Sequence, residues 1–215
     1  MSFLKIKIIV AQIFSIKIKN LFFSLIIKGD RGKDSVIIPI GKFHYSYEKN
    51  SRINIISGCL VFNQKMSNPD PFIGVLKLKK NAIINIQKGF TFFSGHHIIV
   101  HDNALLSIGS GYANYNLKIR CFNKISIGNN VAISENVTIW DTDAHEIVGK
   151  EGNMTQPVTI GDHVWIGLNV TILKGVTIGD GAIIAAGSLV NKDIPANCLA
   201  AGIPAKVVKE NVYWK

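Results

Sequence analysis

Cysteine, proline and charged residues are all scarce in this sequence, and each shortage excludes a class of protein. Three cysteines among 215 residues cannot form a disulfide framework, and their odd number suits a reducing compartment. The 6 prolines and 19 glycines follow no three-residue period, which excludes a collagen-like chain. Charged residues make up 18% of the chain and hydrophobic residues 47%, so the chain is not disordered and can form one sizeable core or two small ones.

Long uninterrupted apolar runs are also absent. Residues 1–28 are rich in Ile, Leu and Phe, but Lys17 and Lys19 keep each run below the roughly 18 to 20 residues that cross a bilayer. The run from Ile8 to Ile16 lacks a small-residue cleavage site after it, so we expect no secretory signal and predict a cytoplasmic location. Residues 1–28 either associate peripherally with an anionic membrane surface at the inner face of the plasma membrane or pack against the fold or a neighbouring subunit.

Acidic residues are scarce in the first half of the chain only. Residues 1–100 hold 15 basic and 4 acidic side chains, whereas residues 101–215 hold 9 basic and 10 acidic ones, so the net charge of +10 belongs to the first half. A basic chain can bind nucleic acid, but the sequence carries no aromatic-basic binding motif, and we expect no nucleic-acid partner. The first half is therefore predicted to meet another kind of anionic partner.

A six-residue repeat is the strongest pattern in the sequence. An aliphatic residue recurs at every sixth position, at Ile160, Ile166, Ile172, Ile178, Ile184 and Val190. A small or apolar residue follows four places later, at Val164, Val170, Val176, Ala182 and Ser188. The same repeat appears upstream at Ile127, Ile133 and Ile139, and neither an α-helix nor an amphipathic strand has this period.

Each repeat describes a short strand followed by a corner. Three such units close a triangular coil, and coils stacked about 4.8 Å apart place their strands in parallel sheets. The predicted fold class is all-β, a parallel β-helix over residues 51–195, with Asn, Asp and Gly at corners that need positive φ. Because Ile108 and Ile127 are 19 residues apart rather than 18, we expect a bulge or widened corner between them.

Three segments fall outside the repeat. Residues 1–50 form a basic and apolar N-terminal segment, helical or irregular. The polar stretch from about 143 to 157 breaks the register between Ile139 and Ile160, which predicts a loop extruded from the prism. Residues 196–215 are predicted to cap the last coil, with a short helix over 205–211.

The ordered set of motifs over residues 105–210 resembles a known family. These motifs are GYANYNL (111–117), ISIGNNVAISENVTI (125–139), DTDAHEI (141–147), the long repeat run 157–195 and AGIPAKVVKE (201–210). They resemble the hexapeptide-repeat acetyltransferases of sugars and polysaccharides, such as galactoside acetyltransferase and capsule or O-antigen O-acetyltransferases. The resemblance implies a left-handed coil, acetyl-CoA as acetyl donor, and a homotrimer whose active sites are shared by two subunits.

His145 is the first candidate for the chemistry. An acetyl acceptor hydroxyl needs a general base, and imidazole has a pKa near the working pH. The resemblance assigns that role to His145, against the alternative of a solvated loop histidine. One of Asp141, Asp143 and Glu146, or a backbone carbonyl, would orient the imidazole.

The resemblance also assigns residues to the acceptor and to coenzyme A. Asn114 would contact the acceptor or the developing oxyanion, against the alternative of an ordinary corner asparagine. Trp165, Tyr112 and Asp143 are assigned to the acceptor, and Trp165 would also touch the pantetheine arm. The positions assigned to coenzyme A are Gly167, Leu168, Ala186, Asn191, Lys192, Lys206 and Lys209. The three lysines among them would lie near its phosphates.

Two other chemistries are not expected. His96, His97 and His101 suggest a zinc site, but corner and surface positions explain them better, and we expect no metal. The three cysteines have no activating histidine, and no serine is placed as a nucleophile, so direct transfer without an acyl-enzyme is expected.

These observations together predict an acetyl-CoA-dependent O-acetyltransferase. Its acceptor would be a sugar hydroxyl of a bacterial surface polysaccharide or its precursor, and the basic first half would meet an anionic glycan, a diphosphate-linked carrier or the membrane. N-acetylation of a nucleotide-linked amino sugar is one alternative. A non-catalytic β-helix scaffold is the alternative from another class.

Overall fold

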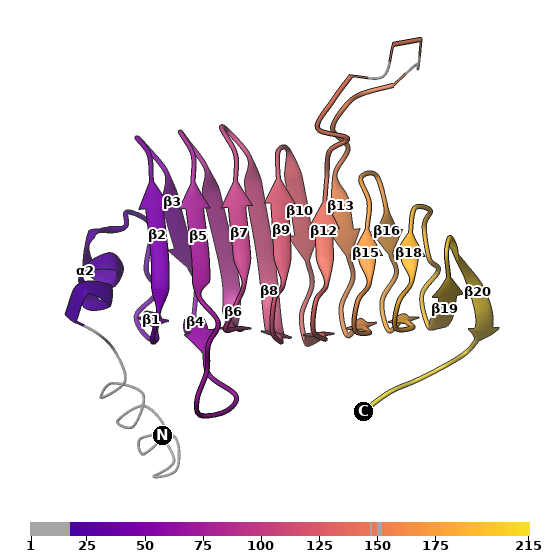
Figure 1. The fold of residues 1–215 in the computed structure, drawn as a ribbon, viewed down its shortest axis with the longest axis horizontal. Helices are drawn as coiled ribbons and strands as arrows, with labels where there is room; N and C mark the ends of the chain where they lie inside the picture. Colours follow the sequence, from indigo (N-terminus) through magenta and orange to yellow (C-terminus); the bar gives the residue numbers. More distant parts are fainter. Residues whose placement is uncertain (1–17, 147, 150–151) are drawn as a thin grey trace.

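The computed structural model describes residues 18–146, 148–149 and 152–215. Within them the chain winds into a prism of stacked coils, with one helix at the N-terminal end and a pair of antiparallel strands at the other (Figure 1). One loop projects from the prism after β12 (Thr138–Trp140). The predicted all-β, parallel β-helical class is confirmed.

The strands form three faces, which we number in the order in which the chain visits them. Face 1 contains β3 (Arg52–Ile55), the first half of β6 (Ile83–Phe93) and of β8 (Leu105–Ala113), β10 (Lys124–Ile127), β13 (Val158–Ile160) and β16 (Thr177–Ile178). Face 2 contains β1 (Val36–Pro39), β4 (Cys59–Gln64), the second halves of β6 and β8, β11 (Val131–Ile133), β14 (Trp165–Ile166), β17 (Ile183–Ile184) and β19 (Cys198–Gly202). Face 3 contains β2 (Phe43–Tyr47), β5 (Gly74–Leu78), β7 (His97–Val100), β9 (Lys118–Cys121), β12, β15 (Thr171–Ile172) and β18 (Leu189–Val190).

The six-residue repeat sets the register of these faces. Ile160 pairs with Ile178 on face 1, Ile166 with Ile184 on face 2, and Ile172 with Val190 on face 3. These side chains are all buried, so each face contributes an aliphatic ladder to one continuous core. The parallel pairing already includes β1 and β2, upstream of residue 51.

The corners are stabilised by stacked polar side chains. We call them corner I (face 1 to face 2), corner II (face 2 to face 3) and corner III (face 3 to face 1). At corner III, Asn50, Asn81 and Asn103 all have positive φ, and each amide donates to the next, at 3.1 and 2.8 Å. Asparagine tolerates this left-handed backbone, so the turn requires no glycine.

The expected widened corner lies between β9 and β10. From Ile119 to Ile127 the chain takes eight residues, where the regular units take six. The extra main chain is held by the fully buried Asp141, whose carboxylate accepts bonds from the backbone N–H groups of Phe122, Asn123 and Lys124 at 2.7, 2.8 and 2.8 Å. A carboxylate with three such donors is a strong local clamp.

The N-terminal end is covered by α2 (Ile18–Ile26). Phe23 and Ile27 enter the core beside the Phe43 and Phe62 rings, while Phe22 and Leu25 remain exposed, Leu25 at 78%. Residues 1–17, which carry most of the sequence motif assigned to a membrane surface, lie outside the described residues. Among the described helices none has the length and hydropathy of a membrane span.

The C-terminal cap differs from the expectation in one respect. Residues 205–211 do not form a short helix: β20 (Ala205–Glu210) is a strand, paired antiparallel with β19. The open edge of β19 presents backbone hydrogen-bonding groups. A strand can pair with them, whereas a short isolated helix cannot. Beyond β20, Trp214 stacks on His163 at 4.2 Å between ring centroids and donates to the His163 carbonyl at 2.8 Å.

Candidate active site

The projecting loop leaves the prism at corner III, between β12 and β13. Its base is fixed by a bridge between Thr142 and Thr155 and by the Gln156 N–H, which donates to the Asp141 carbonyl at 2.9 Å. His145 lies on this loop, exposed, and lines a small cavity of 50 Å³ with Asp143, Glu146, Gly152, Asn153, Met154 and Lys174. The histidine is therefore available to an external substrate.

Lys174 is a residue of this site that the sequence did not single out. Its ammonium pairs with the Asp143 carboxylate at 2.8 Å and donates to the Asn153 carbonyl at 2.6 Å. It follows Leu173 at corner III of the next coil, directly where the loop returns, but one lysine at a corner carries no sequence signal. Lys174 thus ties both arms of the loop to the prism.

The three carboxylates considered as partners of His145 have different surroundings. Asp141 is committed to the β9–β10 corner, pointing into the prism, and is not available to the imidazole. Asp143 is engaged by Lys174, and its assignment to the acceptor stays a prediction. Glu146 is exposed and lines the same cavity as His145, which leaves it the best placed of the three.

Asn114 lies at a different corner from His145. It follows β8 at corner II, half-buried, and its N–H donates to the Ile133 carbonyl at 2.9 Å. In the next coil, face 3 runs between these corners from Val137 to Asp141, four steps along the strand or about 13 Å at about 3.3 Å per residue. Within one chain the two proposed catalytic residues, His145 and Asn114, therefore lie toward opposite ends of face 3.

Five of the positions assigned to coenzyme A are likewise divided between corner II and corner III. Gly167, Leu168 and Ala186 lie at corner II, where the exposed turn of Ala186 and Gly187 has no side chain larger than methyl and a Cβ on Gly187 would meet nothing within 4 Å. Asn191 and Lys192 lie at corner III, after β18. Corner II is thus open enough for an extended ligand to approach the main chain.

The remaining predicted residues lie on the outer surface of face 2. Tyr112 and Trp165 both align with Ala132 in the register, and they are 44% and 43% exposed. Lys206 and Lys209 are on β20, at the edge of the same sheet. Trp214 approaches Trp165 to 6.1 Å between ring centroids, so the C-terminal residues contribute to the surroundings of Trp165.

The histidine cluster and the cysteines show no reactive arrangement. His96 is fully buried among the Phe43, Phe62 and Phe92 rings, and burial lowers its pKa to about 4. Across the described ranges no three His, Cys, Asp or Glu side chains gather as a metal site. Burial, followed by the charge of Asp141, raises the pKa of the Cys121 thiol, so this cysteine is a core residue and not a nucleophile.

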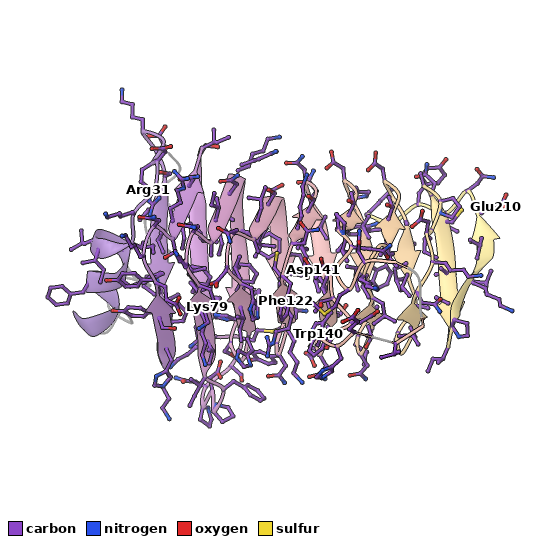
Figure 2. All side chains as sticks on the ribbon, turned by 90° about the horizontal axis from the view of Figure 1, so that it is seen from above. Arg31, Lys79, Phe122, Trp140, Asp141 and Glu210 are labelled. Carbon is purple, nitrogen blue, oxygen red and sulfur yellow. The ribbon has the colours of Figure 1, made fainter. Side chains whose placement is uncertain are left out.

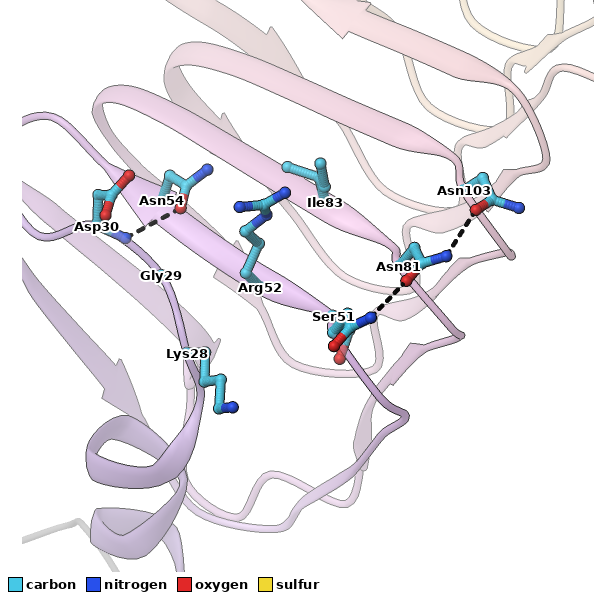
Figure 3. Close-up of a pocket in the computed structure, with 10 residues that line it drawn as sticks. Lys28, Gly29, Asp30, Ser51, Arg52, Asn54, Asn81, Ile83 and Asn103 are labelled. Atoms are coloured by element: carbon cyan, nitrogen blue, oxygen red, sulfur yellow. Dashed lines mark hydrogen bonds between the residues drawn. The ribbon is translucent and has the colours of Figure 1, made fainter.

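A larger cavity of 680 Å³ lies near the N-terminal end, lined by Lys28, Arg52 and the asparagine ladder of corner III (Figure 3). Its lining holds amides, one carboxylate and two cations. It contains no imidazole, thiol or second carboxylate, and its one hydroxyl, that of Ser51, is buried and donates to the Glu48 carbonyl at 2.7 Å, so the lining does not pair a nucleophile with a base.

Comparison with known proteins identifies the repeat. The hexapeptide repeat of succinyl-transferase matches residues 157–192. The chain is 50% identical over 102 residues to galactoside O-acetyltransferase of Escherichia coli (strain K12), covering 46% of this chain and 50% of that protein. It is 38% identical over 94 residues to polysialic acid O-acetyltransferase of Escherichia coli O1:K1 / APEC, covering 42% and 31%.

A solved structure covers more of the chain than these relatives do. The crystal structure of the polySia-specific acetyltransferase NeuO matches with a TM-score of 0.52 and 22% identity, over 88% of each chain. It shows that the fold is the left-handed parallel β-helix of hexapeptide-repeat proteins. The chain spans about half the length of the first curated relatives it matches. The resemblance to hexapeptide-repeat acetyltransferases is confirmed.

Proposed function

We propose that this hexapeptide-repeat protein is an acetyl-CoA-dependent O-acetyltransferase whose acceptor is a sugar hydroxyl of a surface polysaccharide or its precursor. The sugar O-acetyltransferases among its sequence relatives support the reaction class. The observation that carries the proposal is the exposed His145 on a loop that is extruded from the prism at corner III and anchored by Lys174. An exposed imidazole on an anchored loop can act as a base toward a bound hydroxyl.

Acetyl-CoA supplies the acetyl group as a thioester, and the chain's own residues handle the proton and the charge. His145 takes the proton from the acceptor hydroxyl as the new C–O bond forms, and returns it to the thiolate that leaves when the C–S bond breaks. The Asn114 amide donates to the oxyanion that develops between these events. No covalent acyl-enzyme is needed, which agrees with the inert surroundings of Cys121.

A complete site requires two chains in this proposal. His145 is at corner III and Asn114 at corner II, so one chain presents them at opposite ends of face 3. A neighbour that places its corner II against this corner III brings both groups, and both halves of the coenzyme A set, to one cleft. Three copies around a threefold axis repeat that contact in a closed ring, which supports a homotrimer.

The assay for this function measures free thiol release from acetyl-CoA with a panel of hydroxyl and amino sugars. We expect thiol release that depends on hydroxyl sugars, and acetyl esters in the products. Transfer to amino sugars alone would replace the proposal with N-acetylation. No release with any member of the panel would favour the scaffold alternative.

The same proposal places the protein in the cytoplasm with a peripheral contact at the membrane. Exposed Phe22 and Leu25 on α2 follow a lysine-containing apolar sequence, a combination that favours an anionic lipid surface. The full chain should float with vesicles containing anionic lipid. A double variant Phe22→Asp and Leu25→Asp should float at least about threefold less, and equal flotation of the two would contradict the contact.

A further inference from the structure

The outer surface of face 3 carries positive charge without acidic partners. The strands β2, β5, β7, β9 and β12 contain no Asp or Glu at all. Their outward positions hold basic or imidazole side chains on four of the five strands, namely His44, Lys77, His97, Lys118 and Arg120. A surface of one sign at the face that leads into the loop raises the local concentration of anions.

The side chain of Arg120 is held in place on this surface by hydrogen bonds. Its guanidinium donates to the carbonyls of His97 and Ile119 at 2.8 and 3.0 Å, and burial lowers its pKa. Within the described part of the chain no carboxylate pairs with it. The carboxylate nearest to it in the strand register is that of Asp141, which follows Trp140, the partner of Arg120. It points into the prism, and its oxygens accept bonds from three backbone N–H groups. A half-buried cation that is held in place but not neutralised is suited to an incoming anion.

His97 beside it is held in the neutral form. Arg120 donates to its Nδ1 at 3.1 Å, so the ring proton is on Nε2. Burial, and then the positive charges of Arg120, Lys77 and Lys118, lower the pKa of His97. The imidazole therefore positions the guanidinium and adds a donor, while the charge of the group comes from Arg120 and the two lysines.

Trp140 adds an unsatisfied donor on the adjacent strand. It pairs with Arg120 in the β9–β12 register, and its Nε1–H is buried with no hydrogen-bond partner among the described residues. Figure 2 shows Trp140 on the same side of the prism as Lys79 and Phe122, opposite Arg31. A buried N–H without an acceptor is costly, which indicates that an external acceptor completes it.

We propose that Arg120, Trp140 and Lys118 bind an oxyanion of the acceptor, a carboxylate or phosphate on the glycan, so that the preferred acceptor is an acidic sugar. This inference rests on the proposed function. Trp140 is the last residue of the strand from which the loop of His145 departs, so an anion held there places the rest of the sugar at the foot of that loop. Arg120 acts in binding and orientation, and His145 in proton transfer.

The first test measures binding without catalysis. The chain has three tryptophans, so the indole N–H signal of Trp140 can be assigned with Trp140→Phe in the full-length protein. Titration with sulfate should shift that signal saturably, and Arg120→Gln should weaken the affinity at least about tenfold, whereas the matched exposed control Lys88→Gln should not. No shift, or an equal response in Arg120→Gln, would overturn the site.

The second test separates acceptor from donor phosphates. The neutral and acidic sugars galactose and galacturonate, and glucose and glucuronate, form matched pairs for the thiol-release assay. Arg120→Gln should raise the KM of the acidic member about tenfold and leave the KM of the neutral member and of acetyl-CoA unchanged. A raised KM for acetyl-CoA alone would assign the anion to the donor and overturn the proposal. Transfer to no sugar, with the sulfate response intact, would contradict the proposed function and still support the anion site.

Discussion

His145→Ala is expected to lower the rate of acetyl transfer by about 10²- to 10⁴-fold, the contribution typical of a positioned general base. The exposed side chain has no hydrogen bond to the rest of the described chain, so its removal should leave the fold and its thermal unfolding unchanged. The KM values for both substrates should change little, because the imidazole acts on the proton in the transition state. Thiol release under saturating acetyl-CoA measures the loss.

A matched control comes from the first coil, at the opposite end of the prism from the coenzyme A positions. His44 is also an exposed histidine, on β2 far from the loop, and His44→Ala should keep wild-type activity. If His145→Ala retains activity within about threefold of the wild type, the imidazole is not the base. In that case the exposed Glu146 on the same cavity becomes the next candidate.

The shared site can be tested with the same variant. His145→Ala and Asn114→Ala should each be inactive as pure proteins. If each site takes its histidine from one chain and its asparagine from the next, every mixed trimer regains one intact site of three. Equal mixing should then restore about a quarter of wild-type activity, whereas sites built within single chains would restore none.

The sequence predicted the fold well where one regular physical constraint repeats. Because each coil must stack on the last at strand spacing, the six-residue period over 160–190 translates directly into the register seen for Ile160, Ile166 and Ile172. In the N-terminal coils the paired Ile53 and Ile84 are 31 residues apart, and long corners hide the period. There the register could not be read from spacing.

The local sequence predicts the wrong element where a distant strand edge decides the structure. The stretch AKVVKE has no strong strand signal, yet it pairs with β19 because that edge is open. The role of Asp141 was equally hidden, since its three donors come from a corner about 18 residues earlier. The separation of His145 from Asn114 could likewise not be predicted, because sequence distance does not show which corner of the prism a residue occupies.

Asp141→Ala is expected to destabilise the protein by about 3 to 5 kcal/mol, the largest stability effect of any single substitution proposed for it. Among the described residues the fully buried carboxylate is the only acceptor for the N–H groups of Phe122, Asn123 and Lys124, so its removal leaves three donors in the widened corner without a partner. Asp141→Asn keeps the shape and one acceptor oxygen, and should lose less. Urea unfolding monitored by circular dichroism gives both values.

The control for this prediction is Asp102→Ala. Asp102 also accepts a backbone bond at corner III, from Lys80 at 3.1 Å, but it is exposed and water replaces it, so the loss should stay below about 1 kcal/mol. Because the Asp141 carbonyl also accepts the N–H of Gln156, at the base of the loop, the weakened corner should lower activity at temperatures where the protein is still folded. An Asp141→Ala protein as stable as Asp102→Ala would show that the clamp contributes little, and that the six-residue ladders alone hold the widened corner.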